Sequence, residues 1–135
     1  MKIFLGLLLL TLLSSCEKEA DQKELDEKFP TVGVVFNLTG KHSSLDIPSF
    51  KGFQLAFDKL LASNDEVLNQ MELIVQDGKT DPGIASKKLH SLYKNDEIIA
   101  GIGFSDTSFA ALAGKEAESF KKIFISPGAT SPALT

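Results

Sequence analysis

The residues best suited to bind a small solute carry hydroxyl groups or are glycines, and they fall in three separate stretches of the chain. They are Thr39, Gly40, Ser43 and Ser44, then Ser105, Asp106, Thr107 and Ser108, and finally Ser126, Gly128, Thr130 and Ser131. Hydroxyls and free backbone N–H groups at helix N-termini hold anions such as carboxylates, and they need no arginine, which this chain lacks. The same residue types also cap helices and form turns, so plain capping is the alternative interpretation of each stretch.

Residue patterns typical of catalysis or metal binding are weak. His42 and His90 are isolated, and neither has a serine and a carboxylate at a recognisable catalytic spacing. Gly101–Gly103 begins like a dinucleotide-binding motif, but the third glycine is missing. Asp77 and Asp81 are too few carboxylates for a calcium site, and Asp81 before a proline is better explained as a helix cap. We therefore expect no enzymatic activity, no cofactor and no metal.

Composition narrows the class of protein further. The 135 residues are 43% hydrophobic and 24% charged, an ordinary balance for one globular domain. The formal net charge is −4, which argues against a nucleic-acid partner, because phosphate contacts need a basic face. The single cysteine excludes an internal disulfide.

The N-terminus has the pattern of a secretory signal. Residues 3–13 are largely apolar but too few to span a bilayer, for which a helix needs about 20 residues. Cys16 follows two serines, and the segment resembles the lipobox of bacterial lipoproteins, which implies lipidation of Cys16 and stable anchoring by two or three acyl chains. We predict a signal peptide over 1–15 and, over 16–30, the lipidated cysteine with a charged tether. An ordinary signal with an incidental cysteine, or an uncleaved anchor, is the alternative.

Residues 31–135 alternate between strand-like and helix-like segments. The predicted strands are 31–38, 71–76, 98–102 and 123–125, and the predicted helices are 49–63, 81–95 and 109–120. A long polar loop is expected up to Pro48, with Ser49 as the N-cap of the first helix. The apolar face of this helix is expected to be Phe50, Phe53, Phe57, Leu60 and Leu61, with Ala56 beside them.

This alternation predicts an α/β fold with a doubly wound parallel sheet. The order along the chain is β-α-β-α-β-α-β, and right-handed crossovers place helices on both faces. With a strand order of 2-1-3-4, a ligand crevice forms at the carboxyl ends of the first and third strands. The loops facing it would be 39–49, 103–108 and 126–131, so the three hydroxyl-rich stretches converge.

Several motifs carry a family likeness. They are Val34–Gly40 (VVFNLTG), Lys51–Ala56 (KGFQLA), Asp77–Pro82 (DGKTDP), Ile102-Gly103 with Asp106–Ser108, and Ser126–Thr135 (SPGATSPALT). With these motifs the chain from Thr31 resembles the N-terminal lobe of type I periplasmic substrate-binding proteins, in particular the leucine/isoleucine/valine-binding class of ABC importers. The resemblance implies a protein of two lobes that close on a ligand.

The resemblance also implies the site residues. Thr107 stands where the family has a serine that binds the ligand carboxylate, and Ser108 beside it would be a second donor. Gly128 would offer its carbonyl to the ammonium group, and Thr130 its backbone and hydroxyl. Leu45 would lie near the pocket for the ligand side chain.

The chain departs from the family pattern in charge and in length. Asp106 places a negative charge beside the expected carboxylate site, where it would repel an acidic group unless it points away. Phe109 interrupts a run of small hydroxyl residues. Complete members are more than twice as long and have a second lobe, so we expect 31–135 to be an incomplete N-terminal lobe, either a fragment or a truncated gene product.

The expected function is that of a lipid-anchored solute-binding protein in the bacterial cell envelope, at the periplasmic or the outer surface. It would deliver an amino acid or an amide-like solute to ABC permease subunits, and the N-terminal lipid would hold it on the membrane. The alternative is a ligand-sensing receptor lobe, or a surface lipoprotein with no role in transport.

Overall fold

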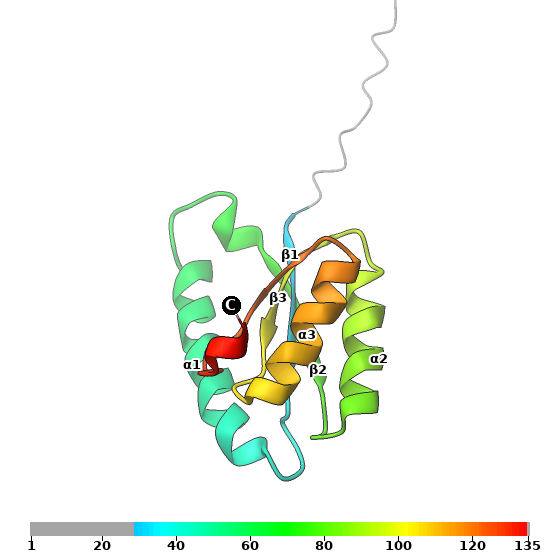
Figure 1. Ribbon diagram of the computed structural model, residues 1–135. Helices are drawn as coiled ribbons and strands as arrows, with labels where there is room; N and C mark the ends of the chain where they lie inside the picture. The colour runs from blue at the N-terminus through cyan, green and yellow to red at the C-terminus, as the bar shows by residue number, and fades with distance from the viewer. Residues whose placement is uncertain (1–28, 135) are drawn as a thin grey trace, which may run out of the picture.

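Four parallel strands form one sheet in the order β2-β1-β3-β4, which confirms the predicted doubly wound topology. The computed structural model describes residues 29–134, so the predicted signal peptide, Cys16 and most of the tether lie outside the described residues. The elements are β1 (Thr31–Phe36), α1 (Ser43–Leu61), a 3₁₀ turn η1 (Leu68–Gln70), β2 (Glu72–Asp77), α2 (Pro82–Tyr93), β3 (Ile98–Gly103), α3 (Thr107–Ser119), β4 (Ile123–Ile125) and a 3₁₀ turn η2 (Pro132–Leu134). Figure 1 shows the sheet between α1 and the pair α2 and α3.

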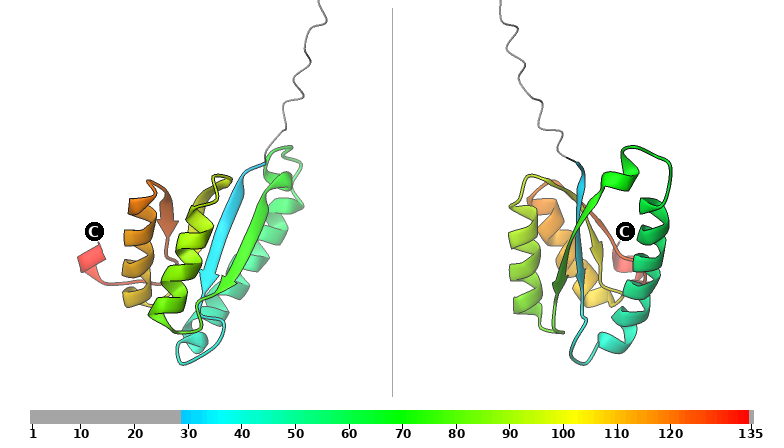
Figure 2. Two further views of the ribbon diagram at one scale, coloured as in Figure 1. Left: turned by 90° about the vertical axis from the view of Figure 1, so that its right-hand side faces the viewer. Right: turned by 180° about the vertical axis from the view of Figure 1, so that it is seen from behind.

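The strand β1 lies in the middle of the sheet because it pairs with both β2 and β3. Val34 is opposite Val75 on one side and Ile102 on the other. The change of direction in strand order therefore falls between β1 and β3, and the loops after these two strands leave the sheet at the same edge. Seen from the side and from behind, α1 covers one face of the sheet while α2 and α3 cover the other (Figure 2).

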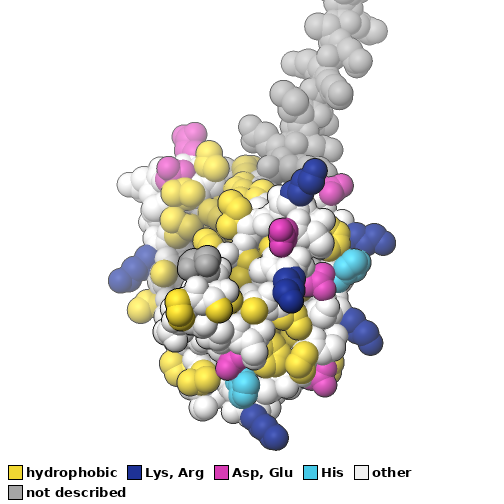
Figure 3. Space-filling model, viewed as in Figure 1, with side chains coloured by type: hydrophobic (Ala, Val, Ile, Leu, Met, Phe, Trp, Pro, Cys, Tyr) yellow, Lys and Arg dark blue, Asp and Glu magenta, His cyan; other side chains and the backbone are white. Residues whose placement is uncertain are grey.

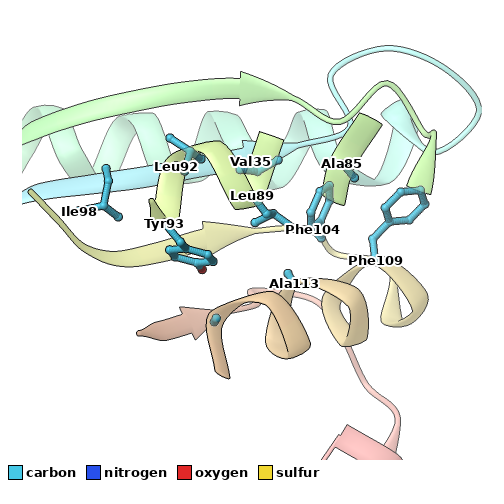
Figure 4. Packing of buried hydrophobic residues seen from close by; sticks show 10 residues of the cluster. Val35, Ala85, Leu89, Leu92, Tyr93, Ile98, Phe104, Phe109 and Ala113 are labelled. Carbon is cyan, nitrogen blue, oxygen red and sulfur yellow. The ribbon is translucent and has the colours of Figure 1, made fainter. Parts of the chain in front are cut away.

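The hydrophobic core lies between the sheet and the helices α2 and α3. Val35 and Phe104 from the sheet side pack with Leu89 of α2 and with Ala113 of α3, all of them buried (Figure 4). Helix α2 begins where it was predicted, because the Asp81 carboxylate accepts the Ile84 N–H at 2.8 Å. This face of the sheet fixes the positions of the strand ends that carry the site.

The first helix differs from the prediction in where it begins. The helix α1 starts at Ser43, so the expected loop up to Pro48 is largely helical and Ser49 is not an N-cap. Pro48 lies inside the helix, although it cannot donate the usual hydrogen bond to Ser44. The buried side chain of Asp46, two residues before Pro48, anchors this first part of the helix to the sheet.

The apolar face of α1 is covered less than the sequence indicates. Its phenylalanines and Leu60 are only half-buried, while Ala56 and Leu61 are exposed, and Asp46 is the one buried residue of the helix. On the sheet, Ile123 and Ile125 of β4 are 64% and 53% exposed. Hydrophobic side chains accordingly gather on the part of the surface that carries α1 (Figure 3). Within residues 29–134, no helix is both long enough and apolar enough to cross a membrane.

Candidate functional site

The carboxyl edge of the sheet brings the predicted loops together. The loops after β1 and β3 and the first turns of α1 and α3 lie at the bottom of Figure 1. This edge is where open parallel sheets bind ligands, at the point where the strand order reverses. The structure therefore confirms the predicted strand order. This order places the hydroxyl-rich stretches at one edge of the sheet.

Asp46 holds the two central strand ends together. Its carboxylate is completely buried, and its two oxygens accept the N–H groups of Asn37 and Ser105, each at 2.7 Å. Asn37 directly follows β1, and Ser105 lies in the loop after β3, so one side chain from α1 bridges the switch point of the sheet. Sequence reasoning missed this residue, because an isolated acid in a presumed polar loop gives no signal of burial.

Ser105 contacts both α1 and the loop after β4. Its hydroxyl donates to the Ser49 hydroxyl at 2.8 Å, which connects it to α1. From the other side, Gly128 packs so closely that a Cβ there would lie 2.7 Å from the Cβ of Ser105. The Ser126 hydroxyl donates to the Phe104 carbonyl at 2.6 Å and fixes the loop after β4 in the same place. Gly128 is thus needed for close packing between two of the three predicted loops.

The loop after β1 is also braced from β2. Asp77 accepts the backbone N–H groups of Leu38 and Thr39 at 2.9 and 3.3 Å, and the Thr39 hydroxyl at 2.7 Å. It also accepts the N–H of Lys79 at 2.8 Å. Burial alone would raise the pKa of Asp77, but these hydrogen bonds together outweigh it and lower the pKa. Asp77 is therefore a structural acceptor that shapes the first loop.

Thr80 completes this brace between the loops after β1 and β2. Its hydroxyl donates to the Thr39 carbonyl at 2.9 Å and accepts the N–H of His42 at 3.1 Å. Gly40 has a φ of +87°, and a Cβ there would lie 2.7 Å from the Thr80 hydroxyl oxygen. The two loops consequently form one packed unit.

Asp106 forms the N-cap of α3. Its carboxylate accepts the N–H groups of Ser108 and Phe109 at 2.9 and 3.3 Å and also the Ser108 hydroxyl. The hydrogen bond from that hydroxyl contributes most to lowering the pKa of Asp106, burial opposes it, and the backbone hydrogen bonds and His42 add to the lowering. His42 Nδ1 lies 3.8 Å from the carboxylate, with its ring edge-on to Phe109. Asp106 thus points back to its own helix and stays charged.

The site residues predicted from the family resemblance lie at this same edge but differ in exposure. Thr107 is half-buried, whereas Ser108, Gly128 and Thr130 are exposed, and Leu45 is 53% exposed. In the described part of the chain, the hydroxyls of Thr107 and Thr130 have no hydrogen-bond partner, but the Ser108 hydroxyl already donates to Asp106. Two of the predicted donors are therefore available to a ligand.

The histidines and Asp81 lie apart from one another along α1 and α2 in the described part of the chain. Among the described residues, no group of three or more histidine, cysteine, aspartate or glutamate side chains could hold a metal ion. His90, on α2, lines the groove between α2 and α3, and its Nδ1 is 3.7 Å from Glu116. Asp81 is used as the cap of α2.

The fold and the arrangement of loops define a class of protein. A parallel sheet of order 2-1-3-4, with helices on both faces, is shared with type I periplasmic binding proteins of known structure. Residues 49–135, more than half of the chain, match the family described as "Receptor family ligand binding region". The chain belongs to this family.

Solved structures agree with that assignment. The substrate-binding protein LivJ of a branched-chain amino acid transporter from Streptococcus pneumoniae, in complex with isoleucine, is 26% identical with a TM-score of 0.73; the match covers 79% of this chain and 31% of that one. A possible leucine/isoleucine/valine-binding protein from Rhodopirellula baltica is 27% identical with a TM-score of 0.64, over 73% and 27% of the chains. A leucine-binding protein from Thermotoga maritima shares the fold at 19% identity and a TM-score of 0.67, over 78% and 29%.

The matches cover most of this chain but only a small part of each relative. The chain spans less than a third of the length of these relatives, whereas the matches cover 73–79% of this chain. No curated protein matches the sequence. The chain thus matches one part of a larger type of binding protein.

Proposed function

We propose that the protein is a lipid-anchored extracytoplasmic solute-binding protein that captures an amino acid or a similar small solute for an ABC importer. The observation that carries the proposal is the convergence of the edge loops at the switch point of the sheet. There Asp46 connects the ends of β1 and β3, and Gly128 packs on Ser105. Within residues 29–134 the Thr107 and Thr130 hydroxyls have no hydrogen-bond partner. The isoleucine complex of the Streptococcus pneumoniae relative supports an amino-acid-like ligand.

Within this proposal, the chain contributes one half of the binding site. Thr107 and Thr130 contact the polar head of the solute, with Ser108 next to them, and the Gly128 carbonyl accepts from an ammonium group. The half-exposed side chain of Leu45 in the first turn of α1 contacts the apolar part of the solute. A second lobe supplies the opposite wall and closes over the solute, since a single exposed surface buries too little of it for tight binding.

The anchor and the location rest on the N-terminal pattern. Cys16 follows an apolar signal-like stretch, and the charged residues 17–28 space the folded part from the membrane surface. The intact mass of the native protein extracted with detergent tests this directly. Acyl chains on a chain that begins at Cys16 would support the anchor, and an unmodified N-terminus would contradict it.

The family description favours one alternative, a ligand-sensing receptor lobe, because it names a receptor region and not a transporter. Both functions need the same edge site, so ligand binding does not separate them. Reconstitution with an ABC permease does: stimulation of its ATP hydrolysis by the loaded protein supports transport, and binding without stimulation favours sensing.

Removing the hydroxyls of Thr107 and Thr130 tests the site. Thr107→Ala and Thr130→Ala should each weaken binding by about 10- to 100-fold, because a hydrogen bond to a charged group contributes about 1.5–3 kcal/mol. Ser119→Ala, at the opposite end of α3, is the matched control and should leave affinity unchanged. Isothermal titration of the full-length protein with common amino acids and short amides provides the measurement. Absence of binding to all of them would refute the amino-acid version of the function.

A further inference from the structure

The N-terminus of α3 is already occupied by a negative charge from the protein itself. The first N–H groups of a helix are free to hold an anion, and this is the usual reason why such a helix end binds a carboxylate. Here the Asp106 carboxylate accepts two of these N–H groups, those of Ser108 and Phe109, together with the Ser108 hydroxyl. An incoming carboxylate next to Thr107 would find fewer donors and a like charge one residue away.

In the neighbouring loops, the protein's own carboxylates also take backbone donors, although among the described residues the buried Nδ2 of Asn37 has no hydrogen-bond partner. Asp46 accepts the N–H groups of Asn37 and Ser105. Asp77 accepts those of Leu38 and Thr39 in the first loop. The protein's own carboxylates therefore consume much of the anion-binding capacity of this edge.

His42 lies beside Asp106. Its Nδ1 is 3.8 Å from the carboxylate, and in the described part of the chain this buried nitrogen has no hydrogen-bond partner. Lys41 and Lys79, in the adjacent loops, are exposed to solvent.

We propose that Asp106 is a specificity-determining residue that excludes a carboxylate from the N-terminus of α3 and selects a solute that presents a neutral amide or a cationic amine there. The inference rests on the proposed function and narrows its solute class, from amino acids in general to amides and amines. The selection is electrostatic. The carboxylate of Asp106 repels an anion, whereas it attracts an ammonium group and tolerates a carboxamide that donates to it.

Pairs of ligands that differ only in this group test the proposal. The probes are L-leucine, L-isoleucine and their primary amides, titrated calorimetrically into the full-length protein. The wild type should bind each amide at least tenfold tighter than the corresponding amino acid. In Asp106→Asn this ratio should fall at least tenfold or reverse, because asparagine keeps the cap but not the charge. Asp106→Ser, which also caps the helix, should behave in the same way and covers the case in which the asparagine variant does not fold.

Asp81→Asn is the matched control. Asp81 caps α2 with the same chemistry but follows the outer strand β2, so its loss of charge should leave the ratio unchanged. A wild-type preference for the amino acids, or an identical ratio in the wild type and Asp106→Asn, would overturn the inference while leaving the solute-binding function intact. Binding of no probe by any of the proteins would overturn the amino-acid-like function, and this inference with it.

Discussion

Replacing Asp46 by asparagine should loosen the switch point of the sheet. The carboxylate has two equivalent acceptor oxygens, and each takes one backbone N–H at 2.7 Å, from Asn37 and from Ser105. Asparagine has one acceptor oxygen, so its amino group must face the other N–H donor. The side chain is fully buried, and water does not replace the lost partner.

The magnitude follows from the single bond lost. A hydrogen bond to a charged group contributes about 1.5–3 kcal/mol, so Asp46→Asn should cost about 2 kcal/mol locally. This corresponds to about a 30-fold increase in the population of the open state at one strand end. Asp46→Ala would lose both bonds and leave a cavity, at a cost of about 4 kcal/mol, which is a large share of a typical domain stability.

Amide hydrogen exchange measured by NMR reads out this change at the two affected groups. In Asp46→Asn, the N–H of Asn37 or of Ser105 should exchange about 30-fold faster than in the wild type. Asp58→Asn, an exposed aspartate in the same helix, is the control and should change exchange by no more than about twofold. Wild-type exchange rates at both amides in Asp46→Asn would refute the assignment of Asp46 as the bridge.

Two further predictions concern the other acceptors and donors of the fold. The Tyr93 hydroxyl is buried without a hydrogen-bond partner among the described residues, and burial raises its pKa to about 12; Tyr93→Phe should therefore leave the free energy of unfolding unchanged or raise it by up to about 1 kcal/mol. Urea denaturation followed by far-UV circular dichroism measures this, and a loss above that size would show a partner for the hydroxyl. The pKa of Asp77 is lowered in the fold, so this group stabilises the protein above its ordinary pKa of 3.8, and that stability is lost as the pH falls through the lowered value. Asp77→Asn should be less stable at neutral pH and should show a weaker loss of stability on acidification, and an unchanged acid profile would contradict the role of Asp77.

The strands and two of the three helices follow from local sequence. Buried parallel strands are short apolar runs such as IIAGI, and Asp81 before Pro82 marks the start of α2 by the same chemistry that the structure shows. The parallel sheet with helices on both faces could be predicted from the β/α alternation and the rule that β-α-β connections are right-handed. These features depend on residues close together in the chain.

The start of α1 and the contacts that brace the site could not be predicted from neighbouring residues in the chain. Pro48 indicates a helix boundary locally, but α1 already begins at Ser43. The buried hydrogen bonds of Asp46 with Asn37 and Ser105 stabilise this first part of the helix. Ser105 is 59 positions from Asp46, and no local pattern indicates such a pair. The incomplete burial of α1 is equally invisible in its helical periodicity, because periodicity shows which face is apolar and not what covers it.

The brace between the loops after β1 and β2 has a consequence for how this region can change in evolution. Gly40 packs against Lys79 and Thr80, which both have positive φ angles. Thr80 in turn forms hydrogen bonds with Thr39 and His42. An insertion or deletion in either loop would separate these partners, so the two loops must keep matched lengths. In an alignment of homologues, positions 39, 40 and 80 should vary together, and gaps in one loop should be accompanied by changes in the other.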